Sequence, residues 1–301
     1  MNSLHYQSYL GAVAGVARDD YAAHRRAVES GEAIEVASKD GRVRMGLAPL
    51  PWDSDILGMP AMRVRDVFHA PGAAGDYAAW DQAARRLDAA LRKAGAAFAD
   101  ARIRLGDYAA LEAFEANGWR VKDVLNIYYA ALAGRTLNET PREDQNAIMC
   151  APIGPVEAAA VFSRCGRLFP EARMRNDHVI PPEVADAFYA RLFESVTARE
   201  GGVAYGAAVD GQYAGAALYR EDDGLRDLGF GLAYLWEIFV RPEYRGRGLG
   251  RRLLEAVLRD AARRHDAFEI GTQVSNLAAN GLYCAAGMRL VANAITLHWR
   301  R

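Results

Sequence analysis

One segment of the sequence, residues 236–254, constrains the local fold more tightly than any other. It has the pattern of an apolar strand ending at Pro242, followed by a loop of alternating arginine and glycine and then by a helix. Three glycines within five residues, Gly246, Gly248 and Gly250, let the backbone turn with its N–H groups facing one point. The start of the helix adds a positive dipole end there. The segment therefore predicts a binding site for a pyrophosphate-like anion.

Arginine side chains add full positive charge around this loop. Arg245 and Arg247 lie within it, and Arg251 lies in the first turn of the expected helix. A phosphate-rich ligand suits such a local excess of positive charge. A solvated helix face would show the same excess, because arginine supplies almost all of the 37 basic residues of this chain.

Two familiar phosphate-binding loops do not fit the spacing. A Walker loop ends in Gly-Lys-Ser/Thr, and no lysine lies near this segment. A dinucleotide fingerprint requires Gly-x-Gly-x-x-Gly at the start of a βαβ unit, whereas the glycines here follow one another at every second residue. An arginine- and glycine-rich surface turn stays open as the plain alternative.

Two motifs carry a resemblance to a known family. The pattern Arg-x-x-Gly-x-Gly at residues 245–250 resembles the acetyl-CoA loop of the GNAT acetyltransferases. Residues 276–288 resemble the second signature of that family, Asn-x-x-Ala-x-x-Leu-Tyr-x-x-x-Gly-Phe, with only Met288 in place of the last residue. Because the two motifs occur in the family's order and separation, residues from about 145 to 301 are identified as a member of the GNAT superfamily.

The resemblance implies acetyl-CoA as cosubstrate and indicates which residues bind it. In the family, the strand before the loop separates from its neighbour, and its main chain holds the pantetheine and polarises the thioester carbonyl. The residues expected to bind coenzyme A are Ile238, Phe239, Val240, Arg245, Gly246, Arg247, Gly248, Leu249, Gly250, Arg251, Asn276, Asn280 and Tyr283.

Tyr283 and Glu237 are the expected catalytic residues. Tyr283 lies where the family places the general acid for the leaving thiolate, and a phenol with a pKa of about 10 suits that task. Glu237 is the candidate base, taking the amine proton through water, although it could instead pair with an arginine. Helix packing for Tyr283 and a pure helix cap for Asn276 are the structural alternatives. His178 is a weaker candidate base.

The pattern of apolar runs and turn residues predicts an α/β protein with a mixed sheet. The predicted domains are an N-terminal α/β domain at 1–135, a polar linker at 136–146 and a catalytic GNAT domain at 147–301. The order of helix, glycine, bulky residue and strand at 107–121 repeats at 276–290. We therefore expect the first domain to be a degenerate GNAT-like half that lacks the cofactor loop.

The acceptor is less constrained by the sequence. Residues 50–58 resemble the Pro-Trp-Asp-Ser segment of the TDP-fucosamine acetyltransferase type, which acetylates the 4-amino group of a dTDP-linked deoxysugar. Residues 172–177 resemble the arginine-rich acceptor segment of that type, and Arg173 and Arg175 favour an anionic acceptor. Another small-molecule or peptide amine, such as an amino acid or an antibiotic, stays open. So does a non-catalytic, regulatory acetyl-CoA-binding module.

Composition sets the remaining expectations. A net charge of −1 favours neither nucleic acid nor a membrane surface as a partner. The three cysteines form no Cys-x-x-Cys pair, which favours a reduced, cytoplasmic protein. The apolar stretch 9–17 lacks the preceding basic residue of a signal peptide. No cluster has metal-ligand spacing, so we expect no metal, and a homodimer stays open.

Overall fold

The structure is a computed structural model that describes residues 1–3, 19–132, 149–162, 172–197, 202–221, 223–226 and 228–301. The chain forms two compact units that interleave along the sequence. Unit 1 consists of Met1–Leu125, Ala172–Ile180 and Ala292–Arg301, and unit 2 consists of Asn126–Glu171 and Pro181–Val291. The predicted linker 136–146 lies outside the described residues, so the boundaries 1–135 and 147–301 stay predictions.

Unit 1 is built on strands in the order β2-β3-β4-β5-β12, and β1 pairs with β4. Strands β4 and β5 run parallel over four residue pairs, and the β2–β3, β3–β4 and β5–β12 pairs are antiparallel. These strands are β1 (Asn2–Ser3), β2 (Ile34–Ala37), β3 (Val43–Pro49), β4 (Ala61–His69), β5 (Phe98–Arg104) and β12 (Arg289–Arg300).

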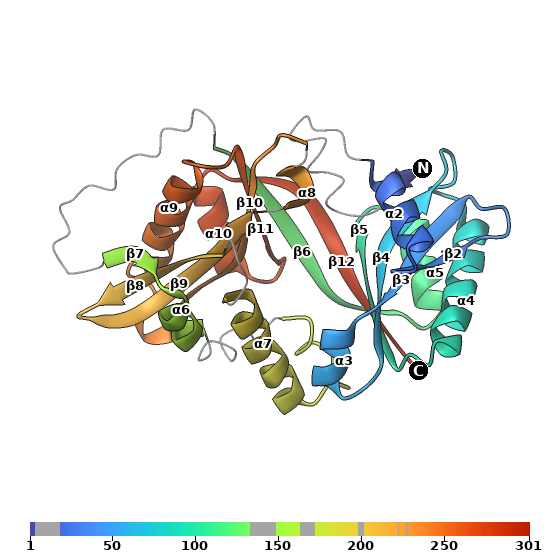
Figure 1. Ribbon diagram of the computed structural model, residues 1–301, viewed down its shortest axis with the longest axis horizontal. Coiled ribbons are helices and arrows are strands. Elements are labelled where there is room, and N and C mark those ends of the chain that lie inside the picture. The colour runs from blue at the N-terminus through green and yellow to red at the C-terminus, as the bar shows by residue number, and fades with distance from the viewer. Residues whose placement is uncertain (4–18, 133–148, 163–171, 198–201, 222, 227) are drawn as a thin grey trace. The chain divides into compact units, whose positions relative to one another are not determined.

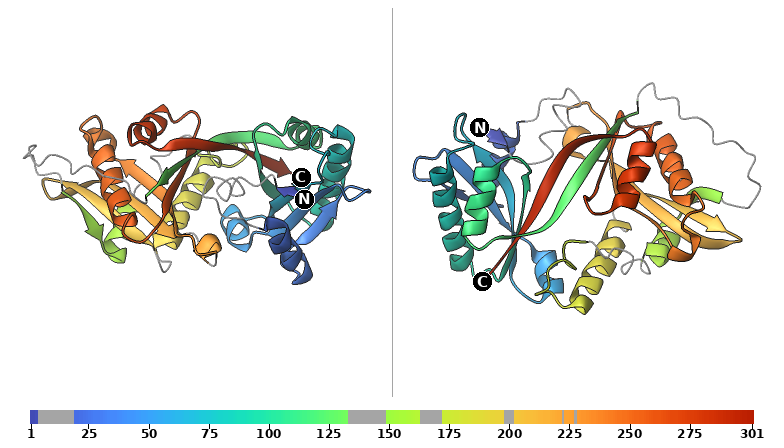
Figure 2. Two further views of the ribbon diagram at one scale, coloured as in Figure 1. Left: turned by 90° about the horizontal axis from the view of Figure 1, so that it is seen from above. Right: turned by 180° about the vertical axis from the view of Figure 1, so that it is seen from behind.

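Helices cover both faces of this sheet (Figures 1 and 2). They are α2 (Asp20–Glu29), α3 (Pro51–Leu57), α4 (Tyr77–Lys93) and α5 (Tyr108–Ala116), with α4 and α5 side by side on one face. Helix α4 begins where the Asp76 carboxylate accepts a hydrogen bond from Ala79 N–H at 3.1 Å. It buries Ala84, Leu87 and Leu91, the positions that the three- and four-residue spacing predicts.

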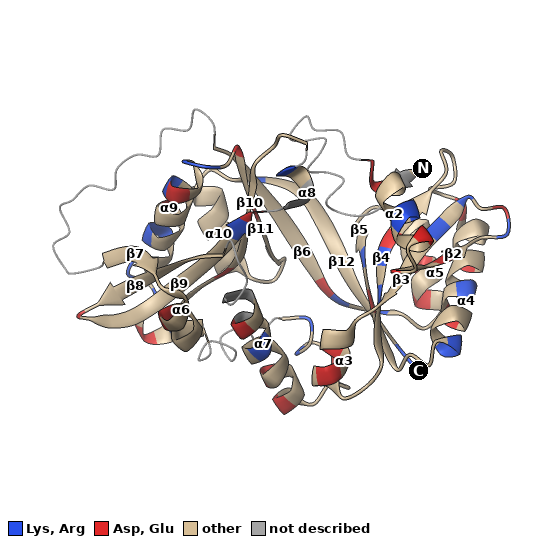
Figure 3. Cartoon of the chain, in the orientation of Figure 1, with Lys and Arg blue, Asp and Glu red and all other residues tan. Residues whose placement is uncertain are grey.

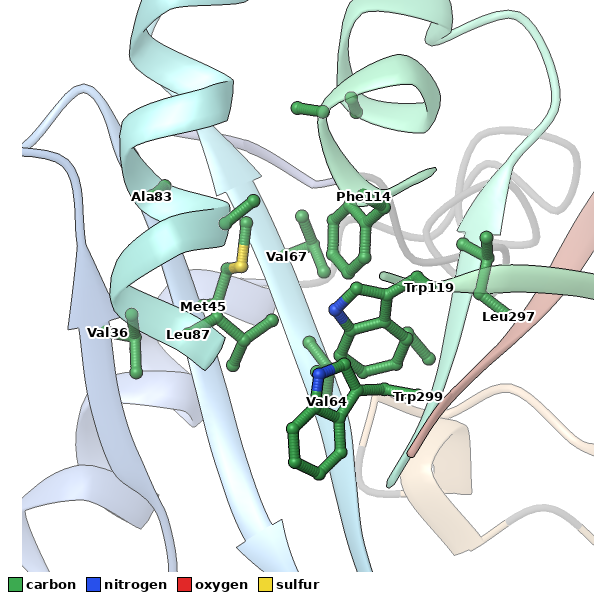
Figure 4. Close-up of a cluster of buried hydrophobic side chains, with 14 of the residues drawn as sticks. Val36, Met45, Val64, Val67, Ala83, Leu87, Phe114, Trp119, Leu297 and Trp299 are labelled. Carbon is green, nitrogen blue, oxygen red and sulfur yellow. The ribbon is translucent and has the colours of Figure 1, made fainter. Parts of the chain in front are cut away.

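The core of unit 1 draws on both ends of the sequence. Trp80 of α4 is fully buried. So are Phe114 of α5, Trp119, and Trp299 near the end of β12 (Figure 4). The Trp299 indole N–H donates to the Asp88 carboxylate on α4 at 3.0 Å. Residues at the end of the chain therefore complete the core of a unit that consists mainly of the first 125 residues.

Unit 2 is built on strands in the order β6-β11-β10-β9-β8-β7. The β10–β11 pair is parallel, and the β7–β8, β8–β9 and β9–β10 pairs are antiparallel. Asp210 and Gly211 both have positive φ in the two-residue turn between β8 and β9, as predicted for a tight hairpin. The strands are β6 (Arg120–Ala131), β7 (Met149–Ile153), β8 (Val203–Val209), β9 (Gln212–Glu221), β10 (Leu232–Val240) and β11 (Ala267–Gln273).

Helices also cover both faces of the unit 2 sheet, with α9 and α10 on one side and α6 and α7 on the other (Figure 2). They are α6 (Pro155–Phe162), α7 (Pro182–Thr197), α8 (Asp223–Arg226), α9 (Leu249–Ala261) and α10 (Leu277–Ala285). Helix α9 packs against β8, β9 and β10 with Leu253, Leu254, Val257 and Leu258 buried. Helix α9 carries charged residues of both signs, as α4 also does (Figure 3).

The predicted fold class, an α/β protein with a mixed sheet, is confirmed. Two local predictions need correction. The apolar run at residues 228–240 predicts a strand over its whole length, but the strand begins only at Leu232, because α8 and a turn at Gly229 precede it. Helix α3 was not predicted, although Pro51 stands at its first position, which proline favours. In the described ranges, no helix is long and apolar enough to cross a membrane.

His24 of α2 is a buried ion-pair centre in unit 1. Its ring contacts Asp66 Oδ2 at 3.3 Å and Glu35 Oε2 at 3.2 Å. Gly46 leaves room for the ring, because a Cβ there would lie 3.0 Å from both His24 Nδ1 and Asp66 Oδ2. Burial alone would lower the pKa of His24, but the hydrogen bonds to the two carboxylates outweigh it and raise the pKa above 6.5.

We expect His24 to make the stability of unit 1 depend on pH. A raised pKa in the folded state stabilises the fold below about 6.5, and this contribution is lost as the pH rises through the folded-state pKa. His24→Gln should lower the free energy of unfolding by about 1–3 kcal/mol at pH 6 and by less at pH 9. Urea titrations at both pH values measure this, and an equal difference at both would contradict the assignment.

Candidate functional site

Strand β10 separates from β11 halfway along its length. The parallel pairing joins Leu232–Leu235 to Ala267–Ile270 and ends there, although β11 continues to Gln273. On its other side, β10 stays paired with β9 as far as Val240. The register with β9 shifts between Leu235 and Glu237, which is a β-bulge at Trp236. Residues 237–240 therefore have one strand edge without a β11 partner.

The direction of the backbone shows which amides face this open edge. Arg241 N–H donates to Ala214 O of β9 at 2.8 Å. Because N–H groups alternate in direction along a strand, Phe239 N–H also faces β9, whereas Ile238 N–H and Val240 N–H face the open edge. Ile238 N–H does not bond β9 but donates to the side-chain oxygen Oε1 of Glu237 at 3.1 Å.

The close approach of β9 to β10 depends on Gly215. A Cβ at this position would lie 2.5 Å from Phe239 O and 3.3 Å from Val240 Cα. Any larger residue would push β10 away from β9 at the end of the strand that leads into the arginine–glycine loop.

The loop after β10 turns at two of its three glycines. Gly246 has φ +76° and Gly248 has φ +75°, a left-handed conformation that glycine adopts without strain. Gly250 instead lies in the first turn of α9, and only side-chain atoms at ordinary contact distance surround its Cβ position. Two glycines rather than three therefore make the turn.

Helix α9 presents its free amides at this loop. Its first backbone hydrogen bond runs from Arg252 N–H to Gly248 O at 3.1 Å. The N–H groups of Leu249, Gly250 and Arg251 consequently have no partner within the helix, and the helix dipole adds positive potential at the same end. This is an anion-binding geometry, as the sequence predicts.

The three predicted loop arginines have different surroundings. Arg245 Nε donates to Val240 O at 3.1 Å and so ties the loop to the end of β10. Arg247 is exposed, lies over the ring of Tyr244 at 5.5 Å from its centroid, and donates from Nη2 to Glu243 O at 3.3 Å. Arg251 pairs with Glu255 at 2.8 Å along the helix surface. Arg245 and Arg247 are thus the arginines held within the loop itself.

Tyr283 of α10 is buried in the core of unit 2. Its ring packs edge-on against Tyr128 of β6, with the centroids 5.5 Å apart. Burial raises the pKa of Tyr283 well above 10, and the negative charge of Glu237 raises it further. The Tyr283 phenol is therefore protonated over the whole physiological range and lies close enough to Glu237 to sense its charge.

Glu237 is held in a desolvated position at the open edge. Burial raises the pKa of its carboxyl to about 8, and the hydrogen bond from Ile238 N–H only partly opposes this. Among the described residues, no arginine or lysine forms an ion pair with it, in contrast to the arginine-partner alternative. A carboxyl group with such a pKa exchanges protons near neutral pH, which is the property of a general base.

The side chains of both predicted asparagines form hydrogen bonds within the protein. Asn276 caps α10, accepting from Ala279 N–H at 3.2 Å and donating to Thr272 Oγ1 at 3.3 Å. Asn280 donates to Gln273 O and Asn276 O and accepts from two side chains of β6. The side-chain amide of Asn280 is thereby saturated. A role for either residue in coenzyme binding stays a prediction.

The sequence-based search missed those two β6 residues, Asn126 and Tyr128. Both donate to Asn280 Oδ1 at 2.8 Å. Their spacing of two residues in an apolar strand places them on the same face, and this was the available signal. Asn126 and Tyr128 precede the predicted linker and the stretch that resembles the GNAT signatures, so those motifs do not point to them.

The predicted acceptor segment lies in unit 1. Arg173 contacts Asp100 Oδ2 at 2.8 Å, and Asp177 contacts His298 Nδ1 at 2.8 Å. Asp100 also accepts hydrogen bonds from Nε and Nη2 of Arg63, at 2.8 and 2.7 Å. Burial acts to raise the pKa of Asp100, but the two guanidinium groups hold it well below its usual range. The charge of Arg173 is therefore largely balanced within the protein.

The remaining candidate residues of unit 1 differ in their burial. Trp52 on α3 is partly exposed, and Asp53 beside it is buried 4.0 Å from Arg173. Burial raises the pKa of Asp53, although Arg63 and Arg173 oppose the shift. His178 is exposed. No group of three or more His, Cys, Asp or Glu residues in the described part of the chain could hold a metal ion.

Unit 1 repeats the strand divergence of unit 2 but fills its open edge. Strands β4 and β5 are paired only from Ala61 to Val64, and a bulge follows at Arg65. Beyond it, Phe68 pairs with Arg44 of β3 on one side and with Ser3 of β1 on the other. Strand β1 therefore occupies the edge that β5 leaves, whereas no other described strand pairs with the corresponding edge of β10 in unit 2.

Part of the sequence matches a known family, and solved structures share the fold. Residues 170–288 match the model of the Acetyltransferase (GNAT) family. No curated protein matches the sequence. A GCN5-related N-acetyltransferase from Sphaerobacter thermophilus is similar in structure, with a TM-score of 0.55 and 18% identity over 89% of this chain and 80% of that chain.

Two further solved structures are similar. A tandem GNAT protein from the clavulanic acid biosynthesis pathway has a TM-score of 0.54 and 21% identity over 89% of this chain and 83% of its own. A GCN5-related glucosamine N-acetyltransferase region in a fungal multi-domain β-N-acetylglucosaminidase has a TM-score of 0.60 and 13% identity, covering 99% of this chain and 38% of that one. The predicted GNAT fold and the predicted enzyme class, an acetyltransferase, are confirmed. GNAT enzymes use acetyl-CoA and act on small-molecule or peptide amines.

Gly215→Ala tests whether the open strand edge depends on the close approach of β9 and β10. The new methyl group would overlap Phe239 O, so we expect the free energy of unfolding to fall by about 1–3 kcal/mol. Gly281→Ala is the matched control, because it lies in α10 with nothing within 4 Å of its Cβ position and should be neutral or slightly stabilising. Equal effects in urea denaturation would contradict the packing argument.

Proposed function

We propose that this protein is an N-acetyltransferase that moves the acetyl group of acetyl-CoA directly to a primary amine. The observation that carries the proposal is the open edge of β10 from Glu237 to Val240, adjoining the Gly246–Gly248 turn and the start of α9. One end of this arrangement offers amides to a carbonyl and an extended chain, and the other offers amides to phosphates.

The residues present fit the coenzyme in two places. The unpartnered amides at the start of α9, together with Arg245 and Arg247, would hold the pyrophosphate. Ile238 N–H and Val240 N–H face the open edge, where the pantetheine arm would add to the sheet like a further strand. Phe239 N–H instead faces β9. The buried Phe239 ring packs against the ring of Phe162, with the centroids 5.5 Å apart.

Acetyl transfer forms a carbon–nitrogen bond and breaks a carbon–sulfur bond. One proton leaves the amine, and one reaches the departing sulfur. We assign the first to Glu237, acting through water, and the second to Tyr283, whose phenol stays protonated because its pKa is raised. The Glu237 charge near Tyr283 couples the two groups, so that protonation of Glu237 makes the phenol a better donor.

The hydrogen bond between Glu237 and Ile238 has a consequence for this scheme. Ile238 N–H is the amide expected to polarise the thioester carbonyl, and the Glu237 carboxyl holds it at 3.1 Å. A thioester that takes this amide releases Glu237, and loss of the bond removes an influence that lowers its pKa. Binding of the donor would thus make Glu237 more basic when the amine arrives.

The acceptor we propose is the amino group of a nucleotide-linked amino-deoxysugar. Support comes from the resemblance of residues 50–58 to the TDP-fucosamine acetyltransferase type, and from the fungal glucosamine N-acetyltransferase region with the same fold. The pairing of Arg173 with Asp100 weakens the argument from free positive charge. The acceptor is therefore the part of the proposal most in need of a direct test.

That test is the release of free thiol from acetyl-CoA in the presence of a panel of amines. The panel contains dTDP-4-amino-deoxysugars, other amino sugars, amino acids and peptides. Turnover with the nucleotide sugars alone supports the full proposal, and turnover with other amines alone keeps the reaction but replaces the acceptor. Acetyl-CoA binding without turnover on any amine would favour a regulatory binding module.

Glu237→Gln tests whether Glu237 is the base, and the raised pKa of Glu237 sets the direction of the expected pH dependence. The wild-type carboxyl is largely protonated at pH 6.5 and ionises as the pH rises through about 8. The ratio of wild-type to variant kcat/KM should therefore grow from pH 6.5 to pH 9, reaching about 100-fold, the lower end of the usual range for acid–base catalysis. A ratio that does not change with pH would remove Glu237 as the base.

A further inference from the structure

A side-chain network joins β6 to the helix that carries Tyr283. Asn126 and Tyr128 lie on one face of β6, and both belong to unit 2 although they precede the residues of the family match. Their partners lie on α10 and at the end of β11. The catalytic unit therefore includes a strand from the first half of the sequence.

Asn280 is the centre of this network. Its Oδ1 accepts from Asn126 Nδ2 and from Tyr128 Oη, each at 2.8 Å, and its Nδ2 donates to Gln273 O at 3.0 Å and Asn276 O at 2.7 Å. All four hydrogen-bonding positions of the amide are filled, which fixes its rotamer. The first turn of α10 is thus bound both to β6 and to the end of β11.

Tyr128 contacts α10 on either side of Tyr283. Its hydroxyl donates to Asn280 Oδ1 and lies 3.9 Å from the sulfur of Cys284, one turn further along the helix. Its ring meets the Tyr283 ring edge-on, with an interplanar angle of 62° and centroids 5.5 Å apart. Both rings are buried. One side chain thereby fixes the rotation of the helix and the plane of the Tyr283 ring.

We propose that Tyr128, assisted by Asn126, is a positioning residue that aims the Tyr283 hydroxyl at the departing sulfur. The proposal rests on the proposed function, since it assigns Tyr128 a task through the general acid. Within the described part of the chain, no group forms a hydrogen bond or an ion pair with the Tyr283 hydroxyl, so the direction of its phenol depends on ring packing. Tyr128 supplies this ring packing, and the hydrogen bond from its hydroxyl to Asn280 Oδ1 holds the Tyr128 ring in place.

The expected kinetic effect is specific. Tyr128→Phe keeps the ring but removes the hydrogen bond to Asn280, so Tyr283 should lose its alignment rather than its environment. Proton transfer depends steeply on geometry, and we expect kcat to fall about 10-fold with the KM for acetyl-CoA unchanged. Tyr129→Phe is the matched control, because Tyr129 is an equally buried neighbour on the opposite face of β6. It should retain the wild-type kcat.

A double-mutant cycle with Tyr283→Phe separates positioning from a structural role. If Tyr128 acts through Tyr283, the double variant should be no slower than Tyr283→Phe alone. Effects of the two substitutions that multiply, or a wild-type kcat in Tyr128→Phe, would overturn the inference. Asn126→Ala provides a second route, with a smaller loss of kcat that should also vanish in the Tyr283→Phe background.

The same experiment distinguishes this inference from the proposed function. A large loss in Tyr283→Phe without any loss in Tyr128→Phe overturns the positioning role and leaves the general acid in place. An unchanged kcat in Tyr283→Phe overturns the general acid and, with it, the task assigned to Tyr128. Melting temperatures of the Tyr128 and Tyr129 variants should both lie well above the assay temperature, so that lower stability does not account for the difference.

Discussion

The divergence of β10 from β11 is the constraint on which the rest of unit 2 depends. A bulge at Trp236 ends the parallel pairing, and the contact of Gly215 with Phe239 O keeps β10 on the side of β9. The amides of residues 238 and 240 face this edge because N–H groups alternate in direction along the strand, and no other described strand pairs with them. The loop and α9 then follow from the direction in which β10 leaves the sheet.

The two units show how small changes separate an open edge from a filled one. Unit 1 has the same short parallel pairing and the same bulge, but β1 covers the edge of β4. The helix before each following strand ends in the same way, with Gly118 and Gly287 at positive φ. Four residues before these glycines stand Phe114 in unit 1 and Tyr283 in unit 2. The first unit therefore keeps the packing and lacks the phenol hydroxyl.

Features set by a few consecutive residues were predictable from the sequence. The positive φ of Gly246 and Gly248, the Asp210–Gly211 hairpin and the Asn276 cap are local and depend on residue type alone. The bonds from Asn126 and Tyr128 to Asn280 and the pairing of Arg173 with Asp100 were not, because these partners lie more than 70 residues apart in sequence. An isolated sequence shows the hydrogen-bonding capacity of a side chain but not which distant group uses it.

The position of Trp299 bears on how the chain acquires its structure during synthesis. Residues 98–104 pair with residues 294–300, so the sheet of unit 1 lacks this strand until residue 300 has left the ribosome. Closing so long a loop is slow, and an incomplete sheet exposes apolar surface meanwhile. Unit 1, which begins before unit 2 along the sequence, is thus completed after it, and removal of residues 294–300 would damage unit 1 before it damaged the helices of unit 2.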